Sequence, residues 1–434
     1  MTILILTLGS RGDVQPYLVL GRGLEDAGHD VTISTSASFA SFVRNQGLSF
    51  HGLTDGFIDL MQAAATGEAM EELATFRGFL RHAPRLWRAS TNLQRELNDD
   101  AWDAARAVDP DLILYHPKMY IAPHVAERLR VPCAIPFVIP MCAPTSRFPS
   151  PGFPTIDVLP DRLARVYNRL TYLCTRGLTQ LATRGFVRRW RRSVGLDASP
   201  ERTSLYRQHT GAPVPIVYGF SRHLVPRPPD WPAHVRIAGP WPLEKTSAWS
   251  PPVDLERFLA DGPAPVYVGF GSMRGRDPRG LANVVIRALQ AAGVRGVLSS
   301  GWGGLEAEDL PADMIRVDDV PHDWLFPRMR AVVHHGGAGT THTGLRAGRP
   351  TVICPFMADQ PFWGRVVRDR GLGPAPIRQV DLTVTSLARA IRRAINDRAM
   401  QRNAARIGAR MQQEKGIRRA VNLVETGARD ARTV

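Results

Sequence analysis

With 434 residues, the chain is long enough for two or three domains with buried cores. Its hydrophobic fraction of 44% and charged fraction of 22% exclude a disordered or fibrous protein. The net charge of +15 comes almost entirely from arginine, and no nucleic-acid-binding motif accompanies it, so we expect no nucleic-acid partner. The four cysteines lack metal-site spacing and are too few for a disulfide scaffold, which favours a reducing, cytoplasmic setting.

The chain opens with an apolar stretch that predicts a buried strand over residues 3–8. A membrane-spanning helix is not expected there or elsewhere, because the chain contains no run of 18 apolar residues. The turn at residues 9–13 leads into a helix with Pro16 in its first turn. Further strands are predicted at 31–34, 112–115 and 134–139. Strands alternating with helices indicate a parallel, doubly wound sheet.

Two segments of the first half have unusual compositions. Residues 131–157 are rich in proline, which predicts a stiff loop that either lines a ligand cleft or runs over the surface. Residues 161–192 intersperse arginine with leucine and aromatic residues, which predicts basic amphipathic helices. Such helices either pack on their domain with solvated arginines or contact a membrane surface peripherally. We therefore expect a cytoplasmic protein, with membrane association as the alternative.

The second half repeats the strand–helix pattern. A strand over 266–270 and a helix over 281–292 are followed by strands at 294–299, 331–334 and 351–355. The final helix is expected to break near Asp397, with its last part packing on the first domain. The expected α/β architecture has two Rossmann-like domains facing a central cleft. Its predicted parts are a first domain at 1–224, a Pro/Trp-rich linker at 225–252, a second domain at 253–405 and a C-terminal helix at 406–434.

Residues 332–363 are the most informative stretch for function. They predict a strand, a glycine-rich turn, a helix, a second strand and then the pair Asp359-Gln360. Glycines between a strand and a helix let backbone N–H groups close on a phosphate at the positive end of the helix. A carboxylate and an amide after the next strand suit sugar hydroxyls. The stretch therefore predicts a nucleotide-sugar site.

Four sequence blocks resemble the UDP-glycosyltransferase superfamily of GT-B fold, in particular its sterol and bacterial natural-product branches. They are GSRGDVQPYLVLGRGLEDAGHDV at 9–31, VYVGFGSM at 266–273, VPHDWLFPRMRAVVHHGGAGTT at 320–341 and PFMADQPFWGRVV at 355–367. The resemblance implies a single displacement at the anomeric carbon with inversion. It implies neither a metal ion nor a cofactor besides the nucleotide-sugar donor, provided that protein dipoles and cations stabilise the leaving diphosphate.

The resemblance implies that Asp13 is the general base. Asp13 lies in Gly12-Asp13-x-x-Pro16, where many plant members carry a catalytic histidine, so a histidine–aspartate dyad of the plant type is not expected. A carboxylate is a weak base at neutral pH, and we expect a dry cleft to raise the pKa of Asp13. An aspartate just before a helix is also a favoured N-cap, and the two roles are compatible.

The resemblance also implies the donor contacts. His335 is expected to donate to the β-phosphate and stabilise the leaving group, next to a glycine turn with hydroxyl donors from Thr340 and Thr341. His334 is expected to point the other way and to be structural. Trp302 either shields the nucleobase or fills the core, and Pro321-His322 replaces the Pro-Gln-like segment of the family, which leaves the base contact open. The full donor set is Ser272, Met273, Trp302, Val320, His322, His335, Gly337, Gly339, Thr340, Asp359 and Gln360.

His116 and Lys118, just beyond a predicted strand, are expected either to contact the acceptor or merely to form an exit turn. Together the motifs predict an inverting hexosyltransferase acting on a hydroxyl of a lipophilic acceptor such as a sterol, a lipid or a polyketide-type product. UDP-glucose is the leading donor, because PFMADQPFW resembles the sterol branch. The alternatives are a dTDP-deoxysugar transferase of antibiotic biosynthesis and a non-catalytic protein that binds sugar nucleotides.

Overall fold

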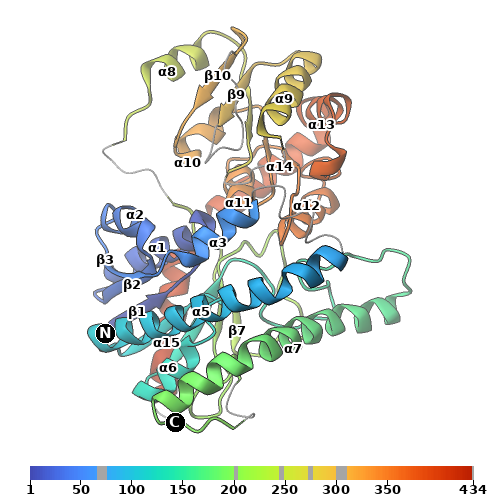
Figure 1. Cartoon of the computed structure of the whole chain (residues 1–434). Helices are drawn as coiled ribbons and strands as arrows, with labels where there is room; N and C mark the ends of the chain where they lie inside the picture. The colour runs from blue at the N-terminus through green and yellow to red at the C-terminus, as the bar shows by residue number, and fades with distance from the viewer. Residues whose placement is uncertain (66–75, 200–203, 244–248, 272–276, 300–309, 433–434) are drawn as a thin grey trace. The chain divides into compact units, whose positions relative to one another are not determined.

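The computed structural model describes residues 1–65, 76–199, 204–243, 249–271, 277–299 and 310–432 (Figure 1). The chain forms two compact α/β units. The first consists of Met1–Gly219, Arg227–Trp241 and Lys415–Val434, and the second of Phe220–Pro226 and Pro242–Glu414. The expected fold class, with a doubly wound parallel sheet in each of two units, is confirmed.

The first unit is built on a seven-stranded, all-parallel sheet in the order β3-β2-β1-β4-β5-β6-β7. Its strands are β1 (Thr2–Leu6), β2 (Asp30–Ser36), β3 (Ser49–Leu53), β4 (Leu112–Tyr115), β5 (Cys133–Phe137), β6 (Ile216–Tyr218) and β7 (Val235–Ile237). The central strands β1 and β4 are apolar almost throughout because both faces of a parallel sheet are covered. The chain leaves β1 toward β2 and leaves β4 toward β5, so the strand order reverses between β1 and β4.

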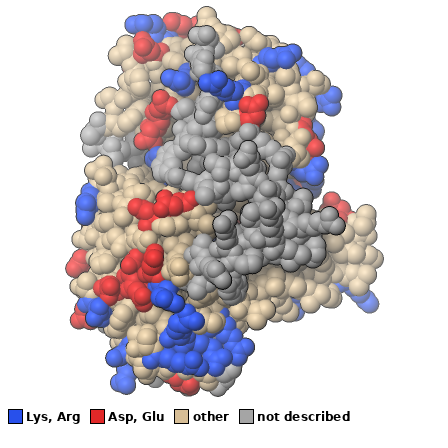
Figure 2. All heavy atoms as spheres, viewed as in Figure 1, with Lys and Arg blue, Asp and Glu red and all other residues tan. Residues whose placement is uncertain are grey.

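Helices cover both faces of this sheet, as expected for a doubly wound fold. They are α1 (Arg11–Glu25), α2 (Ala40–Arg44), α3 (Gly56–Ala65), α5 (Phe76–Val108), α6 (Ala122–Leu129), α7 (Asp161–Ser193) and α15 (Gly416–Arg432), with a 3₁₀ turn at Ala37–Phe39. The last helix, α15, packs against α1, and Ala420, Val421 and Val424 join the core of the first unit. On the face shown in Figure 2, basic side chains gather where α6 and the carboxyl-terminal end of α7 lie in Figure 1.

The second unit has a five-stranded parallel sheet in the order β10-β9-β8-β11-β12. Its strands are β8 (Val266–Gly269), β9 (Gly296–Ser299), β10 (Met314–Val317), β11 (Ala331–His334) and β12 (Thr351–Ile353). Its helices are α8 (Val253–Ala260), α9 (Pro278–Ala292), α10 (His322–Leu325), α11 (Ala338–Arg346), α12 (Gln360–Asp369), α13 (Val384–Asn396) and α14 (Arg398–Gln412), with 3₁₀ turns at Phe326–Arg328 and Gln379–Asp381. The strand order reverses between β8 and β11.

The structure differs from the sequence-based expectations at several boundaries. The segment expected as a linker, 225–252, contains β7, and Arg227–Trp241 belongs to the first unit. Residues 161–192 form the single helix α7 rather than several helices. The helix breaks at Asp397, as expected. Asp397 is the N-cap of the next helix, α14, and its carboxylate accepts a hydrogen bond from Met400 N (3.0 Å). Pro16 lies in the second turn of α1.

None of the helices in the described part of the chain is both long and apolar enough to cross a bilayer.

Candidate active site

Each unit contains candidate site residues, and Asp13 is the centre of those in the first unit. Asp13 lies in the first turn of α1, directly after β1, and His116 and Lys118 follow the adjacent strand β4. Loops that leave neighbouring strands at a reversal of strand order surround the ligand crevice of such sheets. Here they bring Lys118 Nζ to 3.0 Å and His116 Nε2 to 3.2 Å from Asp13 Oδ1.

The second carboxylate oxygen of Asp13 is held by the helix start. Asp13 Oδ2 accepts hydrogen bonds from Ser10 N (2.8 Å) and Ser10 Oγ (3.1 Å). Ser10 is the N-cap residue, so the expectation that Asp13 itself caps the helix is wrong by three positions. Gly9 adopts a φ of 138°, and a Cβ there would come within 2.2 Å of Asp13 Oδ2. Glycine is therefore required before the carboxylate.

The protonation of Asp13 also differs from the expectation. Burial by itself raises the pKa of Asp13, but the charge of Lys118 and the hydrogen bonds of His116 and Lys118 outweigh burial. The pKa of Asp13 is therefore held well below its usual range instead of being raised. Its side chain keeps 20% of its surface exposed, enough for a hydroxyl group to reach it. The carboxylate is ionised at every physiological pH.

His116 is a positioning partner of Asp13. Its Nδ1 accepts a hydrogen bond from Lys118 N (3.0 Å), so the proton of the neutral ring is on Nε2, the atom that faces Asp13. Burial lowers the pKa of His116 despite the neighbouring carboxylate, which keeps the ring neutral. Because Nδ1 is occupied and Nε2 carries hydrogen, His116 has no lone pair for accepting a substrate proton. A dyad of the plant type, with histidine as the base, is not expected from the sequence, and the His116–Asp13 contact does not have that arrangement.

His116 and Lys118, the two residues expected to contact the acceptor, thus both contact Asp13. His116 has only 2% of its side-chain surface exposed and packs edge-on against Phe137 (ring centroids 4.9 Å apart), which leaves it little surface for an acceptor. Lys118 is 35% exposed, and its contact with the acceptor stays a prediction.

His335 is the centre of the candidate site residues in the second unit, at the reversal of strand order between β8 and β11. It directly follows β11, and its ring lies against Gly271 at the end of β8, where a Cβ would come within 3.2 Å of His335 Cε1. Burial lowers the pKa of His335 to about 4, so the ring is neutral at pH 7. Its Nδ1 is buried and has no hydrogen-bond partner among the described residues. A neutral ring beside a helix start is suited to donate to a phosphate oxygen.

The glycine turn after His335 has the geometry of a helix start. Gly336 has a φ of 96°, a left-handed conformation that favours glycine, and Gly337 is the N-cap of α11. A Cβ at Gly339 would meet no atom within 4 Å, and Thr340 is half-buried. The first N–H groups of α11 therefore lie beside open space, as an anion-binding helix start requires.

The side chains of two neighbours of this turn form hydrogen bonds with the protein backbone. The hydroxyl of Thr341 is buried and donates to Gly337 O (2.9 Å), so the expectation that it donates to a ligand is wrong. His334 is fully buried, and its Nδ1 accepts a hydrogen bond from Gly336 N (2.9 Å). This agrees with the structural role expected for His334, on the opposite side of the strand from His335.

Asp359 and Gln360 follow β12 at the start of α12. Gln360 is buried, and its Oε1 accepts hydrogen bonds from Phe356 N (2.7 Å) and Met357 N (3.0 Å). The amide oxygen of Gln360 thus stabilises the preceding turn and is not available to a sugar. This corrects the expectation that the Gln360 side chain both donates hydrogen bonds to sugar hydroxyls and accepts them. The half-buried Asp359 lies at the N-cap position, yet its Oδ2 accepts from Trp363 Nε1 (2.9 Å) instead of capping the helix.

Trp363 is a core residue that connects the start of α12 with the start of α11. Its side chain is fully buried. Its ring packs edge-on against His342 of α11 (centroids 4.9 Å apart) and against Phe220 (6.3 Å). His342 Nδ1 donates to Ala338 O (2.7 Å), the first residue of α11. Trp363 therefore fixes Asp359 relative to the glycine turn.

Replacement of Trp363 by phenylalanine is expected to raise the donor KM about tenfold with a smaller change in kcat, because it removes the N–H that orients Asp359 but keeps a buried ring. Steady-state kinetics with varied donor measure both constants. The matched control is Trp324→Phe, which changes a half-buried indole of the same unit that packs edge-on against Trp249. An unchanged donor KM in Trp363→Phe would show that Asp359 needs no such anchor.

The remaining donor residues expected from the sequence receive less support. Val320 is only 9% exposed and packs in a core cluster. His322 stacks on Phe326 (centroids 4.3 Å apart), and its Nε2 lies 3.2 Å from Tyr267 Oη, so its ring is partly structural. Ser272, Met273 and Trp302 lie outside the described residues.

Comparison with known proteins gives matches in both halves of the chain. Residues 3–145 match the glycosyltransferase family 28 N-terminal domain, and residues 304–419 match the C-terminal domain of erythromycin biosynthesis protein CIII-like proteins. The sterol 3-beta-glucosyltransferase of Arabidopsis thaliana is 36% identical over 97% of this chain. The chain therefore carries a glycosyltransferase family 28 N-terminal domain and an erythromycin biosynthesis protein CIII-like C-terminal domain.

These relatives are longer than this chain. It spans 64% of the Arabidopsis protein and 30% of a sterol 3-beta-glucosyltransferase from Emericella nidulans, which is 36% identical over 98% of this chain. A Streptomyces sp. SF2575 glycosyltransferase in complex with thymidine diphosphate has the same fold, with a TM-score of 0.62 and 20% identity over 98% of this chain and 99% of its own.

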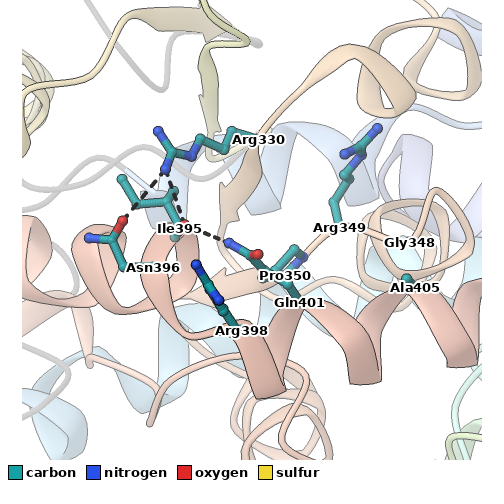
Figure 3. Close-up of a pocket in the computed structure, with 9 residues that line it drawn as sticks. All are labelled: Arg330, Gly348, Arg349, Pro350, Ile395, Asn396, Arg398, Gln401 and Ala405. Carbon is teal, nitrogen blue, oxygen red and sulfur yellow. Dashed lines mark hydrogen bonds between the residues drawn. The ribbon is translucent and has the colours of Figure 1, made fainter.

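One pocket in the described part of the second unit is not at this site. It has a volume of about 630 Å³ and is lined by arginines that precede β11 and β12, whereas the site residues follow these strands (Figure 3). Arg330 there donates to Ile395 O (3.2 Å). Among the described residues, no group of three or more His, Cys, Asp or Glu side chains is arranged to hold a metal ion.

The sequence analysis missed Ser10 and the anchoring role of Trp363. The spacing Ser10-x-x-Asp13 is that of a capping box, so a search for helix starts would have found the first. No local sequence signal indicates the anchoring role of Trp363, because a tryptophan four residues after an aspartate is common in any amphipathic helix.

Proposed function

We propose that the chain is an inverting glycosyltransferase that moves a hexose, with glucose from UDP-glucose as the first choice, to a hydroxyl of a lipophilic acceptor. The observation that carries the proposal is the pair of unlike centres. Asp13 is an ionised, partly exposed carboxylate, and His335 is a neutral ring beside a helix start, with a buried Nδ1 that has no hydrogen-bond partner in the part of the chain that the structure describes. The names of the sterol 3-beta-glucosyltransferase relatives support glucose and a sterol-like acceptor.

The acceptor half of the reaction is assigned to the first unit. The acceptor oxygen forms a bond to the anomeric carbon and loses its proton to Asp13 Oδ1, the oxygen that His116 and Lys118 face. Because the pKa of Asp13 is held low, this carboxylate is too weak a base to deprotonate the hydroxyl beforehand. We infer that the proton moves as the new bond forms, when the attacking oxygen becomes strongly acidic.

The leaving-group half is assigned to the second unit. The bond between the anomeric carbon and the diphosphate oxygen breaks, and its electron pair remains on the diphosphate. His335 donates a hydrogen bond to the β-phosphate, and the first N–H groups of α11 lie where they can share its charge. Asp359 accepts hydrogen bonds from sugar hydroxyls, oriented by Trp363. A single displacement of this kind inverts the anomeric carbon.

The proposal requires neither a metal ion nor a cofactor besides the donor. A dTDP-deoxysugar is the second candidate donor, because thymidine diphosphate is bound to the related Streptomyces structure and Pro321-His322 departs from the family pattern at the base. The remaining alternative is a non-catalytic protein that binds the sugar nucleotide.

A screen of donors against acceptors, with product mass as the readout, tests the proposal. UDP-glucose with a sterol is expected to give a product heavier by one hexose, with and without EDTA. Exclusive use of a dTDP-deoxysugar would replace the donor assignment, and loss of activity in EDTA with recovery on adding metal would contradict the metal-free mechanism. Donor binding by calorimetry without any product would favour the non-catalytic alternative.

A further inference from the structure

Helix α7 carries most of the exposed apolar side chains of the described chain. Of eleven large hydrophobic residues that are exposed, eight lie between Ile156 and Leu181. Six of these form a row on α7, with 49% to 71% of their surface exposed, which we call the leucine stripe: Leu163, Val166, Leu170, Leu173, Leu178 and Leu181. At about 100° per residue these positions share one face of the helix.

The opposite face of α7 is already packed on its own unit. Asn168 Nδ2 donates to Ser146 O (2.9 Å), and the hydroxyl of the buried Tyr172 donates to Pro140 O (3.2 Å). Farther along, the buried Trp190 packs edge-on against Trp102 (centroids 5.8 Å apart). The helix is therefore held in place without the leucine stripe, which remains exposed to solvent. A contiguous exposed apolar row of this size marks an interaction surface.

The charge of α7 indicates which kind of partner its exposed face binds. The helix contains nine arginines and one acidic residue, Asp161. Some of the arginines are committed to the fold, such as the buried Arg191, which pairs with Glu127 (2.6 Å). Others are exposed, and the helical spacing places Arg162 and Arg169 along one border of the stripe, where Arg169 also pairs with Asp230 (3.4 Å). An apolar face bordered by arginine is complementary to a bilayer with anionic headgroups.

We propose that α7 docks flat on an anionic phospholipid bilayer, with the leucine stripe in the interfacial region and the arginines against the headgroups. A second copy of the chain fits this surface less well, because a symmetric contact would bring two arginine-rich helices together. Docking does not depend on the transfer reaction and is measurable without donor or acceptor.

Cys174 offers a native reporter, because it is exposed on the same helix face while Cys133, Cys142 and Cys354 are buried. A thiol-reactive, environment-sensitive dye on Cys174 is expected to shift to shorter wavelength with vesicles of phosphatidylcholine and phosphatidylglycerol. High salt should reduce the shift. A dye at Val380→Cys in a Cys174→Ser chain, an exposed position in the second unit, should not respond. No shift at Cys174, or equal shifts at both positions, would overturn the proposal.

Substitutions separate the apolar and charged contributions. The double variant Leu170→Glu/Leu173→Glu is expected to bind anionic vesicles at least about tenfold more weakly in co-sedimentation. Val253→Glu/Val380→Glu, a matched pair of exposed apolar positions off the stripe, should bind like the parent. Arg162→Gln is expected to lower binding about fivefold, and only with anionic vesicles. Unchanged binding in both α7 variants would overturn the proposal.

Sedimentation velocity without vesicles tests whether a second copy of the chain binds the leucine stripe. The parent and the Leu170→Glu/Leu173→Glu variant are both expected to sediment as the same species. A parent dimer that becomes monomeric in this variant would assign the leucine stripe to a second copy of the chain and overturn docking on lipid.

Discussion

Replacement of Asp13 by asparagine is expected to lower kcat about a thousandfold while the donor Kd stays within about twofold of the parent. Asparagine keeps an oxygen that can accept from Ser10 N, so the start of α1 should persist. It cannot take the proton of the acceptor hydroxyl. Single-turnover kinetics give the rate of the chemical step, and calorimetry with UDP gives the affinity. A variant with the kcat of the parent would remove Asp13 as the base.

The low pKa of Asp13 adds a test in the pH profile of kcat/KM. In the parent, Asp13 stays ionised as pH falls through 6 and 5, so its protonation should cause no loss of activity there. Lys118→Met removes the main cation that lowers the pKa of Asp13. The pKa is then expected to rise, and an acid limb should appear or move to higher pH. Identical acid limbs in the two proteins would show that Lys118 does not control the carboxylate.

Replacement of His335 by alanine is expected to weaken UDP binding about tenfold or more, because a hydrogen bond to a charged oxygen contributes more than a neutral one. The ring is neutral at pH 7, since burial lowers its pKa to about 4, so the effect should arise from one N–H donor rather than from charge. kcat should fall as well, because the charge of the leaving diphosphate develops in the transition state. Titration calorimetry measures the affinity.

Uridine provides the internal control for His335, because it lacks both phosphates. Parent and His335→Ala should bind uridine equally. His335→Gln, which restores an N–H donor, should recover part of the UDP affinity. Identical UDP titrations for parent and His335→Ala would refute the phosphate role, and an equal loss for uridine would indicate a general disturbance of the fold.

The sequence predicted the elements whose signal is local. The strands β1, β4 and β11 are short apolar runs followed by a turn, and such runs are typical of buried parallel strands. The strands β6 and β7 have three residues each, and β7 lies among prolines, so neither shows a period that pattern analysis can detect. Their place in the sheet is set by tertiary contacts, because β6 pairs with β5 and β7 pairs with β6.

For the candidate site, the sequence predicted functional residues at positions that follow strands, but it could not predict the surroundings of their side chains. The effect of Lys118 and His116 on Asp13 requires β1 and β4 to be neighbours in the sheet, and no spacing in the chain encodes this. The same holds for Gln360, whose amide oxygen is bound to the backbone of the turn before it. Residue types can suggest a role, whereas hydrogen-bond partners decide whether a side chain is available for it.

The configuration of the product tests the central claim most directly. Purified protein should be incubated with UDP-glucose, whose glucosyl bond is α, and with a sterol acceptor, and the anomeric proton of the isolated glycoside assigned by NMR. A single displacement that uses Asp13 as the base predicts a β-glucoside. An α-glucoside, or UDP-glucose that binds without transfer to any acceptor of the screen, would contradict the account.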